Sequence, residues 1–403
     1  METVYIIDAC RSPYGKLNGT LAHIRPDDLL AQVMQQLLRR NGTIPHDTID
    51  EVIIGCANQA GEDNRNIARI ASLIAGLPVS VPGVTVNRLC ASGMQAVADA
   101  FLMIGSGNAD IVLAGGVESM TRAPYAMLKP QYAPKGKPEL ADTALGWRFP
   151  SPAFTHQYNT LEMGLTAEVV AEQFGISRGA QDDFALASHR KYFAALEAGR
   201  YDNEIVPVQV PSGKNGFITV DKDEAPRPDT SAEKLAALKT AFKQEGTVTA
   251  GNAAGLNDGA AVLLIASEKA VKQYGLTPLA KIRSFGMAGV HPDIMGIGPV
   301  PAGRKALSKA ALQPGDIDLA EINEAFAAQV LASKKELGID GAKLNVDGGA
   351  LAIGHPLGSS GARITGHLAH QLQQRGGRYG LAAMCVGVGQ GAAIILESVH
   401  HNN

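Results

Sequence analysis

Short apolar runs alternate with amphipathic stretches through the first third of the chain. The apolar runs predict buried strands at residues 4–7, 52–54, 84–86 and 111–113, the last ending in Gly115-Gly116. The stretches between them carry apolar residues at helical spacing and predict helices at residues 29–38, 64–75 and 92–104. Because apolar strands that alternate with helices are typical of parallel sheets covered on both faces, we predict an α/β fold.

The last third of the chain repeats this pattern at a constant offset. An Ile-Asp pair at residues 49–50 recurs at 317–318 (317 − 49 = 268), and a Ser-Gly pair at 92–93 recurs at 360–361 (360 − 92 = 268). We interpret the repeat as an internal duplication of one α/β unit. The alternative is a coincidence between two generic α/β units.

The repeat divides the chain into three parts. We predict an N-terminal α/β half at residues 1–120, to which residues 251–270 return, and a C-terminal α/β half at residues 271–403. Between them, residues 121–250 are rich in Pro and Lys, with short helical patches and a strand-like run at 204–208. This composition predicts an inserted loop domain that faces the substrate.

Composition and charge exclude several classes of protein. Of the 403 residues, 45% are hydrophobic and 19% are charged, which excludes disordered chains and disulfide scaffolds. A formal net charge of −3 provides no excess of positive charge for binding nucleic acid. No apolar stretch approaches the ~18 residues of a membrane span, and a strand pattern begins at Val4. We therefore expect no nucleic-acid partner, no membrane partner and no targeting segment.

Four cysteines, Cys10, Cys56, Cys90 and Cys385, are too far apart for a zinc motif and too few for a secreted scaffold. They predict free thiols in a reducing cytoplasm and no metal site. Cys10 and Cys56 lie in apolar strands and are expected to be structural. Cys90 immediately precedes the predicted helix at 92–104, whose N-terminal partial charge is expected to lower the pKa of the thiol. The alternative for Cys90 is a small buried hydrophobic side chain.

His355 lies in a loop of two glycines and a proline, just ahead of the second Ser-Gly helix start. By the offset of 268 it corresponds to Asn87, so we expect two equivalent strand-to-helix turns to meet and to bring His355 to Cys90. An imidazole with a pKa near ~6.5 is a suitable base for activating a thiol.

Cys385 and Asn323 are further candidates. Cys385 opens the glycine-rich run 385–391, whose backbone N–H groups suit an oxyanion hole. A phosphate site is poorly supported there, because the spacing is not G-x-G-x-x-G. Asn323 follows an apolar strand and precedes a helix, where it would either cap that helix or orient a water against a carbonyl.

Five motifs, taken together and in this order, resemble the thiolase family over essentially the whole chain. They are NRLCASG at 87–93, GGVESM at 115–120, NEAF at 323–326, GHPLG at 354–358 and CVGVGQG at 385–391. The resemblance implies Claisen chemistry on CoA thioesters in a five-layer α-β-α-β-α fold, with two duplicated halves and an inserted loop domain. It also implies that acyl-CoA and coenzyme A are substrates, that no cofactor is needed, and that the chain forms a homodimer or homotetramer.

The resemblance implies a role for each catalytic residue. Cys90 would accept the acyl group, and His355 would activate Cys90 and help to bind the thioester oxygen. Cys385 would protonate the departing acetyl-CoA carbanion and deprotonate the incoming CoA. Asn323 would hold a water in one oxyanion hole, and the N–H groups of Cys90 and Gly387 would form the other.

Further positions match those that surround CoA in the family. They are Met163, Arg227, Phe242, Ala250, Leu256, Met295, Ala325 and Phe326. Two positions depart from the family pattern, since Glu162 stands where many thiolases have His and Ala254 stands where they have a hydroxyl. The missing hydroxyl removes one pantetheine hydrogen bond, worth on the order of 1 kcal/mol.

The sequence segments point to more than one acyl group for the substrate. Residues 55–66 and 146–149 resemble thiolases that act on 3-oxoadipyl-CoA in aromatic degradation, whereas residues 163–168 resemble the acetoacetyl-CoA type. A dicarboxylic acyl tail needs a cation near the pocket, and Arg148 is a candidate. The alternative for Arg148 is a surface or interface residue. We favour degradative cleavage of 3-oxoacyl-CoA over formation of acetoacetyl-CoA. The sequence also leaves open a condensing 3-oxoacyl synthase and a non-catalytic acyl-CoA-binding protein.

Overall fold

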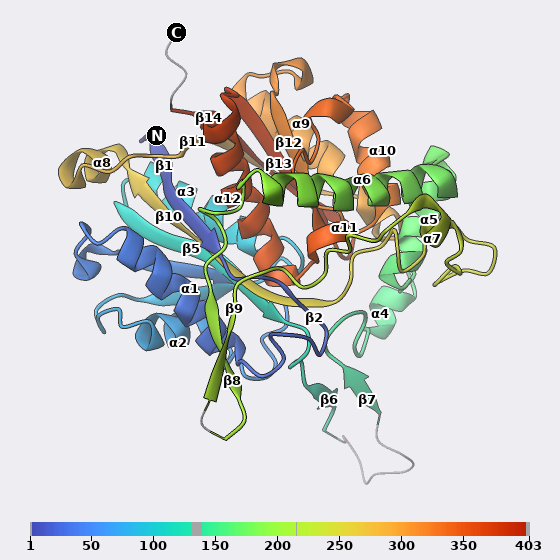
Figure 1. The fold of residues 1–403 in the computed structure, drawn as a ribbon, viewed down its shortest axis with the longest axis horizontal. Coiled ribbons are helices and arrows are strands. Elements are labelled where there is room, and N and C mark those ends of the chain that lie inside the picture. Colours follow the sequence, from blue (N-terminus) through green and yellow to red (C-terminus); the bar gives the residue numbers. More distant parts are fainter. Residues whose placement is uncertain (1, 130–138, 215, 400–403) are drawn as a thin grey trace.

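One mixed sheet is the framework of the molecule (Figure 1). The computed structural model describes residues 2–129, 139–214 and 216–399. In this part of the chain, a ten-stranded sheet has the order β12-β13-β14-β11-β1-β10-β5-β3-β4, with β2 beside β10, and two further pairs, β6-β7 and β8-β9, stand apart. The strands are β1 (Val4–Arg11), β2 (Gly15–Lys16), β3 (Glu51–Gly55), β4 (Gly83–Val86), β5 (Ile111–Ser119), β6 (Tyr125–Met127), β7 (Leu140–Asp142), β8 (Val208–Ser212), β9 (Gly216–Val220), β10 (Asn257–Ser267), β11 (Ala280–Gly289), β12 (Leu319–Ile322), β13 (Tyr379–Val386) and β14 (Gln390–Ser398).

The sheet consists of two halves that repeat the same pairing order. In the first half β1, β10 and β5 are antiparallel neighbours, and β3 and β4 continue in parallel from β5. In the second half β11, β14 and β13 are antiparallel neighbours, and β12 continues in parallel from β13. This repeat confirms the predicted α/β fold with two duplicated halves. The residue bounds of the three predicted parts remain a prediction.

The two halves are joined at one edge, which the sequence does not indicate. Residues Tyr5 and Ile6 of β1 pair antiparallel with Lys281 and Ala280 of β11. We predicted two duplicated α/β halves and made no prediction of how their strands are joined. The apolar pattern of a strand reports which faces are buried, but it does not report whether its edge is paired.

Helices complete five layers around this sheet. Helices α1 and α2 cover the outer face of the first half, α9 and α10 cover the outer face of the second, and α3 and α12 pack together between them (Figure 1). The predicted α-β-α-β-α layering is therefore confirmed. The helices are α1 (Pro26–Arg40), α2 (Ile67–Ile74), α3 (Ser92–Gly105), α4 (Pro152–Thr155), α5 (Met163–Phe174), α6 (Arg178–Glu197), α7 (Ala232–Ala236), α8 (Glu268–Tyr274), α9 (Pro299–Ala310), α10 (Ala327–Leu337), α11 (Ala350–Ile353) and α12 (Leu357–Arg375).

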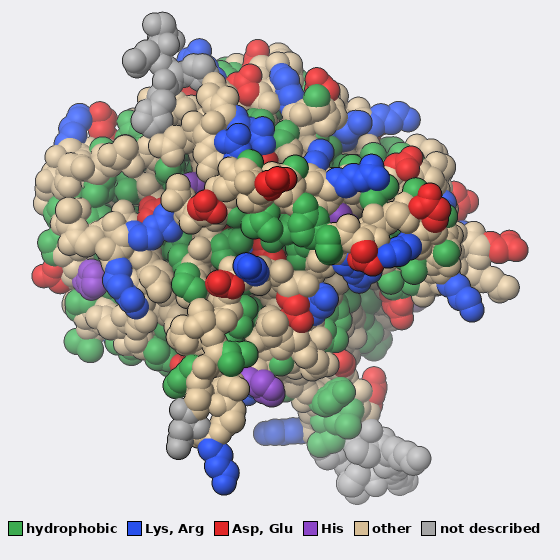
Figure 2. All heavy atoms as spheres, viewed as in Figure 1, with side chains coloured by type: hydrophobic (Ala, Val, Ile, Leu, Met, Phe, Trp, Pro, Cys, Tyr) green, Lys and Arg blue, Asp and Glu red, His purple; other side chains and the backbone are tan. Residues whose placement is uncertain are grey.

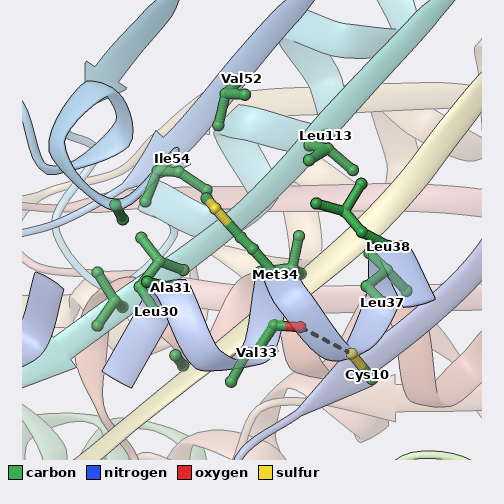
Figure 3. Packing of buried hydrophobic residues seen from close by; sticks show 14 of the residues in the cluster. Cys10, Leu30, Ala31, Val33, Met34, Leu37, Leu38, Val52, Ile54 and Leu113 are labelled. Carbon is green, nitrogen blue, oxygen red and sulfur yellow. Dashed lines mark hydrogen bonds between the residues drawn. The ribbon is translucent and has the colours of Figure 1, made fainter. Parts of the chain in front are cut away.

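The outer core under α1 illustrates how these layers are held (Figure 3). Leu30, Val33, Met34 and Leu37 recur at helical spacing, so one face of α1 is apolar and buried against the sheet. The Cys10 Sγ lies 3.7 Å from the Val33 carbonyl and donates to it. Cys10 therefore packs as a small core side chain, as its position in an apolar strand predicts.

Three element predictions were wrong in extent. Strand β5 does not end at Gly115-Gly116 but runs on to Ser119, and a Cβ on Gly116 would collide with the Gly358 carbonyl. The predicted strand at 204–208 is replaced by β8, which begins at Val208, and by a single bridge between Arg11 and Ile205. The insertion carries the 12-residue α5 and the 20-residue α6, where only short helical patches were expected.

The surface carries charges of both signs. On the face drawn in Figure 2, basic and acidic side chains are interspersed, without a large field of one sign. Among the described residues, no helix combines the length and the apolar character that a bilayer crossing requires.

Candidate active site

Cys90 lies in the tight turn between β4 and α3. Leu89, just before it, has a φ of 45°, a left-handed conformation that is strained for a bulky side chain. The Ser92 hydroxyl fixes this turn, because it accepts from the Arg88 N–H at 2.9 Å and donates to the Leu89 carbonyl at 2.7 Å. The half-buried Cys90 thiol therefore has a defined position at the start of α3, as predicted.

The Cys90 thiol opens onto a cavity of about 240 Å³. The predicted residues Arg148, Met163 and Gly387 line the same cavity, so four of the predicted positions meet there. The lining also includes Ala57, Asn58, Leu89, Glu118, Thr143, Ala144, Leu145, Gly146, Trp147, Leu357 and Val388. The wall is mostly apolar, which suits an acyl chain.

The pKa of Cys90 does not follow the sequence prediction. Burial raises the pKa of the Cys90 thiol to about 11, and the Gly387 N–H, which lowers it, only partly compensates. We expected the N-terminus of α3 to lower the pKa of this thiol. For the site without a bound substrate, that expectation is wrong. Burial in a folded pocket outweighs the partial charge of a helix end, because desolvation disfavours the thiolate.

Cys385 lies near the end of β13 and is fully buried. Burial and then the charge of Cys90 raise the pKa of Cys385. The two thiols are therefore close enough to influence each other. The side chains of Met163, Ala167, Val248, Ala253, Met295, Ala325 and Phe326 pack in one cluster with Cys385. Four of the predicted CoA positions thus surround the second cysteine.

His355 is held between α11 and α12 in a defined tautomer. Its backbone N–H donates to the Asn257 Oδ1 at 3.0 Å, and its Nδ1 lies 2.6 Å from the Ser360 Oγ. The Ser360 hydroxyl donates to the Pro356 carbonyl at 2.9 Å, so it accepts from the His355 Nδ1–H. The Nε2 atom is therefore unprotonated and available as a base. Burial, and then the charge of Arg363, lowers the pKa of His355 to about 3, well below the value that we expected.

Asn323 contacts His355 and does not cap a helix. Its Nδ2 lies 3.4 Å from both ring nitrogens of His355. Helix α10 begins at Ala327 with Phe326 at its N-cap, so the capping alternative for Asn323 is wrong. Among the described residues, the buried Asn323 Oδ1 has no hydrogen-bond partner. A buried amide oxygen without a partner is well suited to hold a water or a reacting group.

Three of the four remaining predicted CoA positions line a second cavity. Arg227, Ala250 and Leu256 line a cavity of about 100 Å³, together with Gly354, the neighbour of His355. Phe242 packs against Gly164 and makes an edge contact with Phe326, with ring centroids 6.4 Å apart. The assignment of the eight positions to CoA stays a prediction.

Among the described residues, His355 makes no direct hydrogen bond with Cys90. The hydrogen bonds described for His355 go to Asn257, Asn323 and Ser360. Proton transfer from Cys90 to His355 therefore also stays a prediction.

Two residues with a clear place in the site were not assigned a role from the sequence. Glu118 is buried in the Cys90 cavity, accepts from the N–H groups of Ala57 and Gly358 at 3.0 and 2.9 Å, and has a pKa that burial raises to about 7. In the sequence, Glu118 stands out only as an acidic residue inside an apolar, glycine-rich run. Ser360, which sets the tautomer of His355, was noted only as part of the repeated Ser-Gly pair.

Comparison with known proteins identifies the family. Residues 4–269 match the thiolase N-terminal domain and residues 276–398 match the thiolase C-terminal domain. A beta-ketoadipyl-CoA thiolase of Pseudomonas knackmussii is 53% identical over 398 residues, covering 98% of this chain and 99% of that protein.

Two solved structures share the fold over 99% of this chain. The acetyl-CoA acetyltransferase of Bacillus anthracis is 45% identical, with a TM-score of 0.92 over 99% of its chain. The human mitochondrial 3-ketoacyl-CoA thiolase in complex with CoA is 41% identical, with a TM-score of 0.91 over 98% of its chain. The two family matches cover most of the chain, the relatives match it over nearly its whole length, and this chain belongs to the thiolase family.

Proposed function

We propose that this acyltransferase cleaves 3-oxoadipyl-CoA with coenzyme A, giving acetyl-CoA and succinyl-CoA. The relative with 53% identity is named a beta-ketoadipyl-CoA thiolase, which supports this substrate. The observation that carries the reaction type is the pair of thiols: Cys90 lines an apolar cavity beside the Gly387 backbone, and Cys385 lies within its electrostatic reach.

In the first half-reaction, the Cys90 sulfur attacks the C3 keto carbon while its proton passes to Nε2 of His355. The N–H groups of Cys90 and Gly387 stabilise the oxyanion on C3. The C2–C3 bond then breaks, and its electron pair forms the enolate of acetyl-CoA. The His355 Nε2–H and a water on Asn323 stabilise the enolate oxygen. Cys385 then protonates C2.

In the second half-reaction, the Cys385 thiolate takes the proton of an incoming CoA thiol. The CoA sulfur attacks the succinyl thioester on Cys90, and the Cys90 thiolate leaves and recovers the proton from His355. A neutral His355 and a protonated Cys90 are the correct starting states for this sequence, because each proton that one group releases is accepted by another.

Two cysteine variants test these roles. Cys90→Ala should abolish covalent acylation, because it lacks the nucleophile. Cys385→Ala should still be acylated by simple thioesters but should lose carbon–carbon cleavage by a factor of about 100 or more, because the enolate is no longer protonated. Mass spectrometry of the intact protein measures acylation, and formation of acetyl-CoA measures cleavage. Equal cleavage by Cys385→Ala and the unchanged enzyme would remove the role of Cys385.

Two competing functions predict different results in the same assays. A biosynthetic acetyl-CoA C-acetyltransferase would form acetoacetyl-CoA and would cleave acetoacetyl-CoA faster than 3-oxoadipyl-CoA. A non-catalytic acyl-CoA-binding protein would bind acetoacetyl-CoA without forming acetyl-CoA when CoA is added.

We also propose a homodimer or homotetramer located in the cytoplasm. Tyr125, Met127 and Leu140 on the β6-β7 pair are exposed by 73, 56 and 63%, which supports burial against another subunit. The four cysteines are all unpaired thiols, which supports a reducing compartment. Light scattering after size-exclusion chromatography measures the assembly. Dialysis against a chelator, which removes metal ions, tests the prediction that the reaction needs no cofactor.

A further inference from the structure

We infer that Arg148 determines substrate specificity by binding the terminal carboxylate of the acyl chain. This inference rests on the proposed function and names the group that would distinguish a dicarboxylic substrate from an unbranched fatty acyl chain. It follows from the position of Arg148 in the Cys90 cavity, from its contacts and from the nature of the surrounding wall.

Arg148 is held in the cavity wall by an ordered turn. Gly146 and Phe149, on either side, have φ values of 83° and 49°, and the chain bends around Arg148. Between them, the Trp147 Nε1 donates to the Leu161 carbonyl at 3.1 Å, and its ring packs on Phe154 with centroids 5.0 Å apart. The segment is therefore anchored through Trp147, and it places Arg148 in the same wall as Cys90.

The guanidinium of Arg148 is oriented by neutral groups only. Its Nη1 donates to the Asn58 Oδ1 at 3.1 Å, and its Nη2 lies 3.4 Å from the Asn58 carbonyl. Asn58 is itself held, because its N–H donates to Glu118 at 3.2 Å and its Nδ2 donates to Thr143 at 3.1 Å. Among the described residues no carboxylate pairs with Arg148. Three of its five N–H donors remain for a ligand.

Of the described residues that line this cavity, Arg148 is the only cation. The second charged residue of the lining is Glu118, whose oxygens already accept from backbone N–H groups. The rest of the wall is largely apolar, with Leu145, Trp147 and Met163 in it. An arginine in such a wall favours a carboxylate, because its guanidinium donates charge-assisted hydrogen bonds to it, and the exposed side chain of Arg148 is open to a ligand. A succinyl group on Cys90 carries its carboxylate two methylenes beyond the thioester.

A matched pair of substrates tests the inference. In 3-oxoadipyl-CoA and 3-oxohexanoyl-CoA the acyl chains have the same length, and only the terminal carboxylate or methyl group differs. The unchanged enzyme should cleave 3-oxoadipyl-CoA with the higher kcat/KM. Arg148→Met should lower kcat/KM for 3-oxoadipyl-CoA by about ten- to a hundredfold, the range expected for a charge-assisted hydrogen bond. Its kcat/KM for 3-oxohexanoyl-CoA should change less than about twofold.

Two further variants keep the test independent of folding. Arg148→Lys retains a cation and should recover part of the preference for 3-oxoadipyl-CoA. Asn58→Asp retains the arginine but places a carboxylate where the amide oxygen now lies 3.1 Å from it, so it should also reduce this preference. Arg190→Met is the control, because Arg190 is an exposed arginine on α6 outside the cavity, and it should leave both rates unchanged.

The outcomes separate this inference from the proposed function. If the unchanged enzyme prefers 3-oxoadipyl-CoA and Arg148→Met keeps that preference, the inference is wrong and the proposed function stands. An equal loss on both substrates, or a rise only in the KM for CoA, would assign Arg148 to CoA binding and also overturn the inference. If the unchanged enzyme does not distinguish the two substrates, the dicarboxylic substrate itself is wrong.

Discussion

Burial sets the resting protonation of the two groups that start the reaction. The Cys90 thiol has a pKa of about 11, and the His355 imidazole has a pKa of about 3. At neutral pH both groups are uncharged, so the nucleophile is not a stored thiolate. The Cys90 thiol therefore has to lose its proton as its sulfur attacks the keto carbon. At that moment negative charge develops on the keto oxygen, and the oxyanion hole stabilises it. This order protects the free enzyme against oxidation and alkylation, because the thiolate is the reactive form.

The reactivity of Cys90 towards iodoacetamide should therefore follow its raised pKa. We expect the alkylation rate to increase about tenfold per pH unit between about pH 7 and pH 9.5, because the thiolate fraction grows tenfold per unit below a pKa of about 11. Peptide mass spectrometry after timed quenching measures the rate at this residue, with Cys90→Ser as the control for labelling elsewhere. A plateau near pH 8 would mean that the thiol ionises far more easily than its burial implies.

For single residues of the site, the residue types and the motif spacing could be predicted from the sequence. It placed Cys90 before a helix, His355 in a rigid loop and Asn323 after a strand, and the structure has all three in those positions. It could not supply the pKa values, because desolvation depends on tertiary packing. The tautomer of His355 also depends on a three-dimensional contact with Ser360.

At the scale of elements, the close crossing of α3 and α12 connects the two halves of the site. Gly93 on α3 faces the backbone of α12, and Gly361 on α12 faces Met94 of α3. The missing side chains allow the two helices to approach, and the turns before them carry Cys90 and His355. The 268-residue repeat predicted that these two turns are equivalent, and the pairing of α3 with α12 follows from that symmetry.

Gly93→Ala tests this close approach. A Cβ at Gly93 would lie 2.6 Å from the Gly358 carbonyl and 2.8 Å from the Ala362 N–H, so the helices must move apart. We expect a loss of about 1–3 kcal/mol in the free energy of unfolding and a drop of about tenfold or more in the rate of Cys90 acylation. Urea denaturation and stopped-flow acylation measure the two effects.

A second glycine provides the control for this substitution. Gly179 in the first turn of α6 has open space around its Cα, so Gly179→Ala should stabilise the protein slightly and leave acylation unchanged. A Gly93→Ala enzyme with unchanged stability and rate would show that the helix contact is more tolerant than the geometry implies.

Across the whole molecule, one buried ionic cluster ties distant segments together. Glu204, ahead of β8, pairs with Arg11 on β1 and with His367 on α12, and all three side chains are buried. Although burial opposes it, the charges of His367 and Arg11 lower the pKa of Glu204. In the same way, the charge of Glu204 raises the pKa of His367 against burial. The partners are far apart in sequence, so no local pattern could predict the cluster.

Removing the central carboxylate should destabilise the fold. Glu204→Gln leaves His367 with the more distant Asp347, at 3.7 Å, and leaves Arg11 with Asp223, so we expect a loss of about 3 kcal/mol at pH 6. The folded pKa of Glu204 is lowered, so its contribution is complete above its unfolded pKa of about 4.3 and is lost as the pH falls. The difference between the variant and the unchanged protein should therefore shrink at pH 3.

Urea denaturation at both pH values measures this difference. Glu336→Gln removes one partner of the exposed pair with Arg304 and should cost less than about 0.5 kcal/mol, which makes it a suitable control. A pH-independent loss in Glu204→Gln would indicate that packing, and not charge, accounts for the effect.

The edge pairing of β1 bears on how the chain is synthesised. This strand is synthesised well before its neighbours on both sides, β10 and β11, which lie within residues 257–289. Its backbone N–H and C=O groups cannot pair with those strands, and are left to water, until those residues exist. The nascent chain therefore carries an unpaired apolar strand through much of translation, and such a strand is the kind of segment that chaperones shield.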